Sequence, residues 1–228
     1  MLSSRRWTIS ILQRLLRPST ASSQCRLFTL SLLSLLLDPA AVDDVRSDLF
    51  KRHSDYQIQI HDRSIKIDFV WSPFESNISS FIRSIEGSAS SSPDVIVAGS
   101  GLWHMLHVTD PADYGGKLSE IKKEASKAGV LEHAFWLGLP ELVETMLNTE
   151  EKRLNMNRTM QESYRAELGK SGMLKRDGGQ FLLIDVGFLS RECGAMCTED
   201  GMHYDQRVYD SAVQIMLNAL LIESQQRV

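Results

Sequence analysis

The chain has 228 residues, of which 43% are hydrophobic and 24% charged, and its 25 Lys and Arg against 29 Asp and Glu give a formal net charge of -4. This composition excludes collagen-like, low-complexity and broadly disordered chains, and the length suffices for one hydrophobic core. A pI of about 5.9 argues against a surface that neutralises nucleic-acid phosphates, so no nucleic-acid partner is expected. Function must therefore come from a localised site.

The N-terminal part differs in charge from the rest of the chain. It contains five arginines and no acidic residue before Asp38. Arg and Ser interleaved with the apolar residues between Trp7 and Leu16 are typical of the basic amphipathic helix of an organellar presequence, and a disordered or misassigned start is the alternative. We therefore divide the chain into a presequence-like or disordered N-terminus, residues 1–21, and one domain, residues 22–228. Taken alone, this start predicts a mitochondrial or plastid location.

The most apolar run, residues 27–37, spans 11 residues between Arg26 and Asp38-Pro39. Crossing a bilayer takes about 20 residues. We therefore predict a buried helix that ends at Asp38-Pro39, and no encoded membrane anchor.

Further along, the apolar pattern alternates between the periods of strands and helices. Residues 56–60 and 64–71 alternate polar and apolar side chains and predict a hairpin or two neighbouring strands. Apolar runs at 94–98, 133–137 and 180–186 predict buried parallel strands. This alternation predicts a three-layer α/β/α domain with a mainly parallel sheet, whose ligands bind at the carboxyl ends of the strands. Helices are expected over residues 76–85, 115–129, 141–170 and 205–223, and a loop over 190–204.

The strongest chemical signal is the pentapeptide Asp200-Gly-Met-His-Tyr204, which lies between the last predicted strand and the last predicted helix. On a tight turn, Asp200 accepts a hydrogen bond from one ring nitrogen of His203 while the other nitrogen faces a pocket. A general base and the carboxylate that orients it have this arrangement. The alternative is that Asp200 and His203 only begin a helix, with Asp200 as its cap.

Two motifs together resemble a known family. The Asp-x-x-His of residues 200–203 and the Gly-x-Gly-x-Trp of residues 99–103 resemble the SGNH (GDSL-type) hydrolases. Within these, residues 93–103 and 200–204 resemble the luminal domain of the sialic-acid O-acetyltransferases and, more remotely, the plant trichome-birefringence-like (PC-esterase) polysaccharide O-acetyltransferases. The resemblance covers about residues 21–224. It implies a serine nucleophile early in the chain, on a turn that leads into the first helix.

The resemblance places that nucleophile at Ser23, three residues before Arg26, in the position of the family's Gly-Asp-Ser pattern. Here Ala21-Ser22 stand in place of Gly-Asp, and no strand-like apolar run precedes them, so the first strand is expected to be missing. An alternative start or a misplaced exon would explain both departures. They favour a second hypothesis, a catalytically impaired remnant or pseudoenzyme that acts as a binding module.

For an active member, the resemblance implies an O-acyl, chiefly acetyl, esterase or O-acetyltransferase that acts on glycans or small esters through an acyl-enzyme in the secretory pathway or Golgi. Ser23, Asp200 and His203 are then the catalytic residues. Many relatives have Asn where this chain has Gly99, so backbone N–H groups or the Ser100 hydroxyl are the oxyanion donors that remain there. The family's second block is not placed. The residues assigned to the oxyanion and the substrate are Gly99, Ser100, Gly101, Trp103 and Arg26, with a core role as the alternative for Trp103.

Other candidate sites are weaker. Cys193 and Cys197 with His203 lack a fourth ligand, so no metal site is predicted, and a disulfide or two free thiols both stay open. The glycines of residues 99–101 lack the third glycine and the Lys-Ser/Thr of a phosphate-binding loop, so no nucleotide or other cofactor is expected. His104 and His107 are either substrate contacts or ordinary surface residues.

Overall fold

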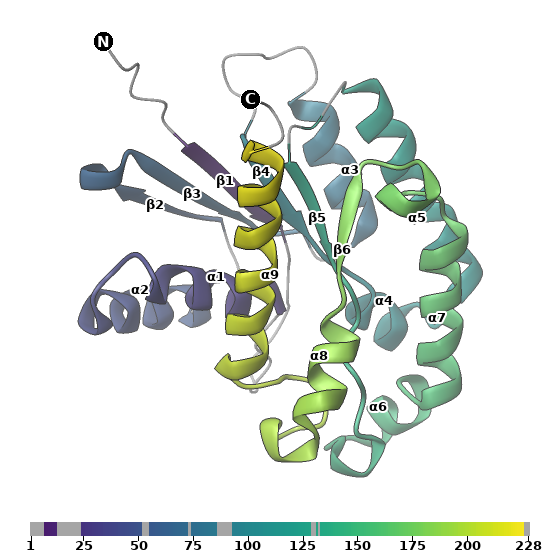
Figure 1. The fold of residues 1–228 in the computed structure, drawn as a ribbon. Helices are drawn as coiled ribbons and strands as arrows, with labels where there is room; N and C mark the ends of the chain where they lie inside the picture. The colour runs from purple at the N-terminus through teal and green to yellow at the C-terminus, as the bar shows by residue number, and fades with distance from the viewer. Residues whose placement is uncertain are drawn as a thin grey trace.

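The computed structural model describes residues 7–12, of which only the backbone is considered, together with residues 24–51, 55–72, 74–85, 93–128, 131 and 133–225. They form a six-stranded sheet in the order β2-β3-β1-β4-β5-β6 (Figure 1). Strand β2 is antiparallel to β3, and the other neighbouring strands are parallel. The strands are β1 (Trp7–Leu12), β2 (Tyr56–Ile60), β3 (Ile65–Val70), β4 (Val95–Ala98), β5 (His133–Leu137) and β6 (Phe181–Ile184).

Strand β1 corrects two expectations about the N-terminus. It lies between β3 and β4, pairing Trp7 with Ile65 and Ile9 with Val95 in parallel register. The first strand is therefore present, and the amphipathic helix expected from Trp7 onward is wrong for these six residues. The alternation Trp7, Ile9, Ile11 has the two-residue period of a strand, and the pairing with β3 and β4 is that of a strand.

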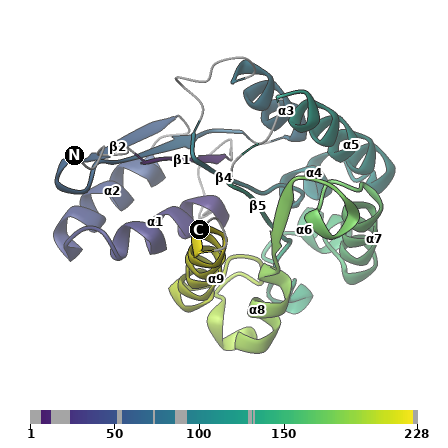
Figure 2. The same ribbon diagram turned by 45° about the horizontal axis from the view of Figure 1, so that its top comes forward.

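Helices cover both faces of the sheet, which confirms the predicted three-layer architecture. Figure 2 shows α1, α2, α8 and α9 on one side and α3, α5 and α7 on the other. Val97 and Phe135 pack with the first group, whereas Ile96 and Trp136 pack with the second, because successive side chains of a strand point to opposite faces. The helices are α1 (Gln24–Ser34), α2 (Pro39–Lys51), α3 (Glu75–Ser84), α4 (Leu102–His107), α5 (Pro111–Lys127), α6 (Glu150–Asn155), α7 (Arg158–Lys170), α8 (Val186–Cys193) and α9 (Gln206–Gln225).

Two helices begin at Asp-Pro pairs. Asp38 accepts a hydrogen bond from the Ala41 N–H at 3.0 Å, so the Asp38-Pro39 that follows α1 also begins α2. In the same way Asp110 caps α5 at Pro111, four residues before the predicted start. Among the described residues, every helix is too short or too polar to span a bilayer.

The segment after β6 is more ordered than the sequence analysis predicted. Helix α8 begins at Val186, capped by the Asp185 side chain, which accepts the Phe188 N–H at 2.9 Å. A short 3-10 turn, Ala195–Cys197, follows. The loop expected from residue 190 is therefore confined to the residues around and after this turn.

Candidate active site

The predicted base and its orienting carboxylate come together at the carboxyl edge of the sheet, in the turn before α9. The Nδ1 of His203 lies 2.6 Å from Oδ2 of Asp200. An ionised carboxylate only accepts hydrogen bonds, so Nδ1 carries the hydrogen and Nε2 is the basic nitrogen. No hydrogen bond within the described part of the chain uses His203 Nε2. This is the tautomer that a general base needs.

The backbone of the same turn also binds the carboxylate. Oδ1 of Asp200 accepts the N–H of Met202 at 3.1 Å and the N–H of His203 at 2.8 Å. The cap of α9 is Asp205, which accepts the Arg207 N–H at 3.0 Å, so the helix-cap alternative for Asp200 does not hold. Asp200 therefore holds both the main chain and the imidazole of His203.

Thr198 closes the turn from its other side. Its hydroxyl donates to the His203 carbonyl oxygen at 2.8 Å and accepts the Gly201 N–H at 3.0 Å. Thr198 and Tyr204 form an antiparallel bridge. Residues 198–204 thus form a turn that is closed by hydrogen bonds from both sides.

Several groups act on the protonation of Asp200. Burial raises its pKa, but the hydrogen bond and positive charge of His203 and the two backbone N–H groups outweigh burial, so the net pKa is lowered from its ordinary value. Asp200 is therefore ionised near neutral pH, in the form that accepts the hydrogen bond of His203 Nδ1.

A cavity of about 340 Å³ lies beside this pair. His203 and Asp200 line it with side chains that are 10% and 19% exposed. The base is therefore mostly buried and borders a cavity. The other lining residues are Met196, Cys197, Thr198, Glu199, Tyr204 and Asp205.

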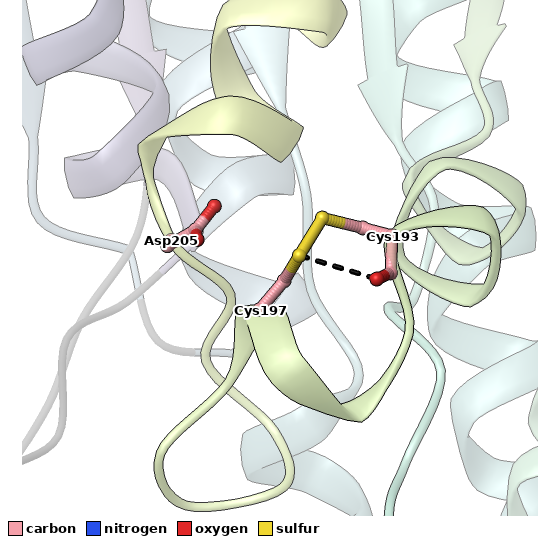
Figure 3. A group of neighbouring side chains, drawn as sticks. All are labelled: Cys193, Cys197 and Asp205. Carbon is pink, nitrogen blue, oxygen red and sulfur yellow. Dashed lines mark hydrogen bonds between the residues drawn. A yellow bond between two sulfur atoms is a disulfide. The ribbon is translucent and has the colours of Figure 1, made fainter.

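A disulfide joins Cys193 to Cys197 (Figure 3). It links the end of α8 to the start of residues 198–204, which we call the histidine turn. This settles the pairing that the sequence left open. Asp205 lies beside the two sulfur atoms, and the three residues together have the spacing of a metal cluster. The sulfurs are bonded to each other and the Asp205 carboxylate is bonded to Arg207 at 2.6 Å, so the protein itself uses these ligand atoms.

Residues 99–101, the glycine turn predicted to bind the oxyanion, directly follow β4. Gly101 has φ of +115°, which strongly favours glycine, and its carbonyl oxygen accepts the Met105 N–H as α4 begins. A Cβ on Gly99 would lie 3.0 Å from Cβ of Leu137. A side chain at residue 99 would therefore be crowded by Leu137 of β5.

The other predicted residues lie in different surroundings. Ser23 lies outside the described residues; the residue after it, Gln24, begins α1. Arg26 is buried with its guanidinium 4.4 Å from the ring centroid of Trp71, and burial lowers its pKa to about 10. Trp103 is half-buried, with its ring edge-on to His107. The roles of these residues stay predictions.

Sequence reasoning missed two features of this edge. His104 is buried and bonded to Tyr164 and Asp113, so it is neither a surface residue nor a substrate contact. Glu75 begins α3 just after the carboxyl end of β3 and is 1% exposed. Its place just after the carboxyl end of the predicted strand 64–71 is the signal that points to it, because parallel strands carry ligand sites at their carboxyl ends.

Known proteins resemble the chain in sequence and in fold. No protein-family model matches it. It is 43% identical over 221 residues to Protein ALTERED XYLOGLUCAN 9 of Arabidopsis thaliana, a match that covers 90% of this chain and 60% of that protein. The chain thus spans about three fifths of the length of this relative.

Two solved hydrolases have the same architecture. A lipase/acylhydrolase from Enterococcus faecalis superimposes with a TM-score of 0.54 at 12% identity, covering 93% of this chain and 94% of that one. A GDSL-like lipase from Bacteroides thetaiotaomicron gives 0.52 at 9% identity, covering 96% and 89%. The chain therefore has the fold of the SGNH (GDSL-type) hydrolases, which confirms at the level of the fold the resemblance seen in residues 99–103 and 200–203.

Proposed function

We propose that the chain is an O-acyl, chiefly acetyl, esterase or O-acetyltransferase that modifies glycans through an acyl-enzyme. The observation that carries the proposal is the 2.6 Å contact between His203 Nδ1 and Asp200 beside a cavity. A histidine held in this tautomer, in a fold used by acylhydrolases, is suited to deprotonate a serine hydroxyl.

In the proposed first step, His203 Nε2 takes the proton of the Ser23 hydroxyl while Oγ attacks the ester carbonyl carbon. Asp200 stabilises the imidazolium. The tetrahedral intermediate then expels its alcohol, which receives the proton from His203, and Ser23 is left acylated. In the second step, water or a sugar hydroxyl gives its proton to His203 and attacks the acyl group, and His203 then returns this proton to the serine oxygen as the serine is released. Water makes the protein an esterase, and a sugar hydroxyl makes it a transferase.

The tetrahedral oxyanion requires donors that are already in place. The glycine turn at residues 99–101 supports this role, because it follows β4 and opens onto the same edge of the sheet as the histidine turn. Because Gly99 has no side chain, the proposed donors are backbone N–H groups or the Ser100 hydroxyl. Losing one oxyanion donor costs on the order of 10²–10³ in kcat.

A glycan substrate is supported by the relative's name, which refers to xyloglucan. That relative is longer than this chain, so the acyl donor and the acceptor are open to experiment. A secretory location is supported by the disulfide at the histidine turn, because disulfides persist in oxidising compartments.

The test is hydrolysis of p-nitrophenyl acetate by the full chain, since β1 belongs to the sheet. Ser23→Ala, Asp200→Asn and His203→Ala should each abolish most of the activity. Ser22→Ala and the exposed His61→Ala are the matched controls and should leave it intact. Mass spectrometry of quenched enzyme should place one acetyl group on the peptide that contains Ser23. Activity that persists in both Ser23→Ala and His203→Ala would contradict the mechanism.

The second candidate, a catalytically impaired binding module, is favoured by Ala21-Ser22 in the place of Gly-Asp. It predicts no hydrolysis and no acetyl-enzyme, together with saturable binding of acetylated xyloglucan oligosaccharides. Such binding should weaken when bulky residues replace those that line the cavity, for example Thr198→Trp.

A further inference from the structure

A cluster of buried polar side chains lies behind the glycine turn, on the side of α4, α5 and α7. We call Glu75, Ser100, His104, Tyr114 and Tyr164 the inner polar cluster; all five are buried. Buried polar groups in native proteins nearly always have hydrogen-bond partners, so each member of such a cluster requires an account.

Three members, His104, Tyr114 and Tyr164, contact one another, and His104 also contacts Asp113. His104 contacts the Tyr164 hydroxyl at 2.7 Å through Nδ1 and Asp113 at 2.9 Å through Nε2. Tyr114 stacks on Tyr164 with ring centroids 4.7 Å apart. Its hydroxyl donates a long hydrogen bond, 3.5 Å, to the carbonyl oxygen of Ser100. The cluster therefore touches the backbone of the glycine turn.

The side chains of Glu75 and Ser100 have no such hydrogen-bond partners among the described residues. Both carboxylate oxygens of Glu75 and Oγ of Ser100 are buried, and among the described residues none makes a hydrogen bond of standard geometry. The structure shows no ion pair of Glu75 within the described part of the chain. The two groups are nevertheless close enough for the Ser100 hydroxyl to act on the protonation of Glu75.

The groups around Glu75 together favour its neutral form. Burial raises its pKa most strongly; its own backbone N–H, the Ser100 hydroxyl and His104 of α4 oppose this, Asp113 of α5 adds to it, and the net pKa is raised. Tyr114 of α5 and Tyr164 of α7 also face it, and Glu75 raises the pKa of both. All of these groups except His104 are uncharged or acidic, so no fixed cation balances a carboxylate here.

We propose that Glu75 is a positioning residue for the oxyanion turn: its neutral carboxyl donates a hydrogen bond to the Ser100 hydroxyl and so holds residues 99–101 with their backbone N–H groups toward the reacting ester. The role in catalysis rests on the proposed function. A buried carboxylate without a cation is costly, whereas a neutral acid carries no charge and can donate a hydrogen bond to the Ser100 oxygen. Tyr114 holds the Ser100 carbonyl, so the turn is bound from two sides.

The test compares Glu75→Gln, which keeps the shape and a donor, with Glu75→Leu, which keeps the volume without one. Glu120→Gln, exposed on α5, is the control for loss of a negative charge. In p-nitrophenyl acetate hydrolysis, Glu75→Gln should keep kcat within about threefold. Glu75→Leu should lower kcat by about 10- to 100-fold with KM unchanged, because a small displacement of catalytic groups has this effect.

A second readout needs no activity. A folded pKa above the unfolded value stabilises the fold at low pH, and this contribution is lost as the pH rises from about 4 through the raised pKa. The stability of the wild type against urea should therefore fall over that pH range relative to that of Glu75→Gln. Glu120→Gln should follow the wild type.

The outcomes separate the two proposals. If the wild type hydrolyses p-nitrophenyl acetate only weakly and His203→Ala is equally active, the proposed function fails. Urea unfolding across the pH range then still tests whether Glu75 is neutral. If Glu75→Gln lowers kcat as much as Glu75→Leu, or is less stable than wild type at every pH, Glu75 acts as a charged group and the inference is overturned. Glu75→Leu with wild-type kcat overturns the positioning role.

Discussion

The backbone N–H of Val143 donates a hydrogen bond of 2.8 Å to the carbonyl oxygen of Gly201, at the tip of the histidine turn. Val143 belongs to the segment that follows β5. Leu139 of the same segment packs against Gly101, where an added Cβ would lie 3.0 Å from its Cδ2. One segment thus contacts both the turn that holds the base and the turn proposed to bind the oxyanion, and it fixes their separation.

Replacing Gly201 with alanine should disturb this joint. Gly201 has φ of +78°, and a Cβ there would lie 2.5 Å from the Val143 carbonyl oxygen. Gly178 has φ of +81° and open space around it, so Gly178→Ala measures the backbone strain alone. We expect Gly178→Ala to cost about 1 kcal/mol and Gly201→Ala about 1–3 kcal/mol more in urea unfolding. Equal losses in the two variants would mean that the contact with Val143 carries no energy.

Asp200→Asn should impair catalysis more than it impairs folding. The amide oxygen still accepts the backbone N–H groups of Met202 and His203, so the turn persists. The amide nitrogen, however, no longer stabilises an imidazolium and favours the wrong tautomer of His203. We expect kcat for p-nitrophenyl acetate to fall by about 10²–10⁴-fold with little change in KM. An unchanged kcat would show that Asp200 only shapes the backbone.

The protonation of Asp200 should also be visible in stability. Its folded pKa is lowered, so it stabilises the fold above its unfolded pKa of about 3.9, and this contribution is lost as the pH falls through the folded value. The melting temperature of the wild type should therefore drop toward that of Asp200→Asn below about pH 4. Curves that stay parallel down to pH 2 would contradict the assignment.

The disulfide should brace the histidine turn. Asp205 donates its N–H to the Cys197 carbonyl at 2.8 Å, so Cys197 connects the disulfide to the residues just after His203. Replacing Cys193 and Cys197 with alanine should cost about 2 kcal/mol, because the loop that the bond closes is short. Dithiothreitol should lower wild-type activity and leave the double variant unchanged, and the double variant is thus the control for effects of the reductant elsewhere.

Local pattern was sufficient for much of this fold. The hairpin of β2 and β3, the strands β4 and β5 and the Asp200–His203 pair all follow from short-range signals: alternation, apolar runs and a three-residue spacing. Other features depend on partners that are distant in sequence. The burial of Glu75, with its neighbours on α4, α5 and α7, is decided by tertiary packing. The same holds for β1, where flanking arginines suggested a presequence.

Removal of residues 1–12 is the sharpest test of that last point. Strand β1 pairs with β3 on one side and β4 on the other, from Trp7↔Ile65 to Leu12↔Ala98, so its loss separates β2 and β3 from the rest of the sheet. The exposed ladders of β3 and β4 then have no backbone partners. We expect the shortened chain to lose cooperative thermal unfolding and to aggregate. A chain that lacks residues 226–228 is the control and should unfold like the wild type. If the protein without residues 1–12 instead folds and melts normally, β1 is dispensable and the presequence interpretation of residues 1–21 regains its place.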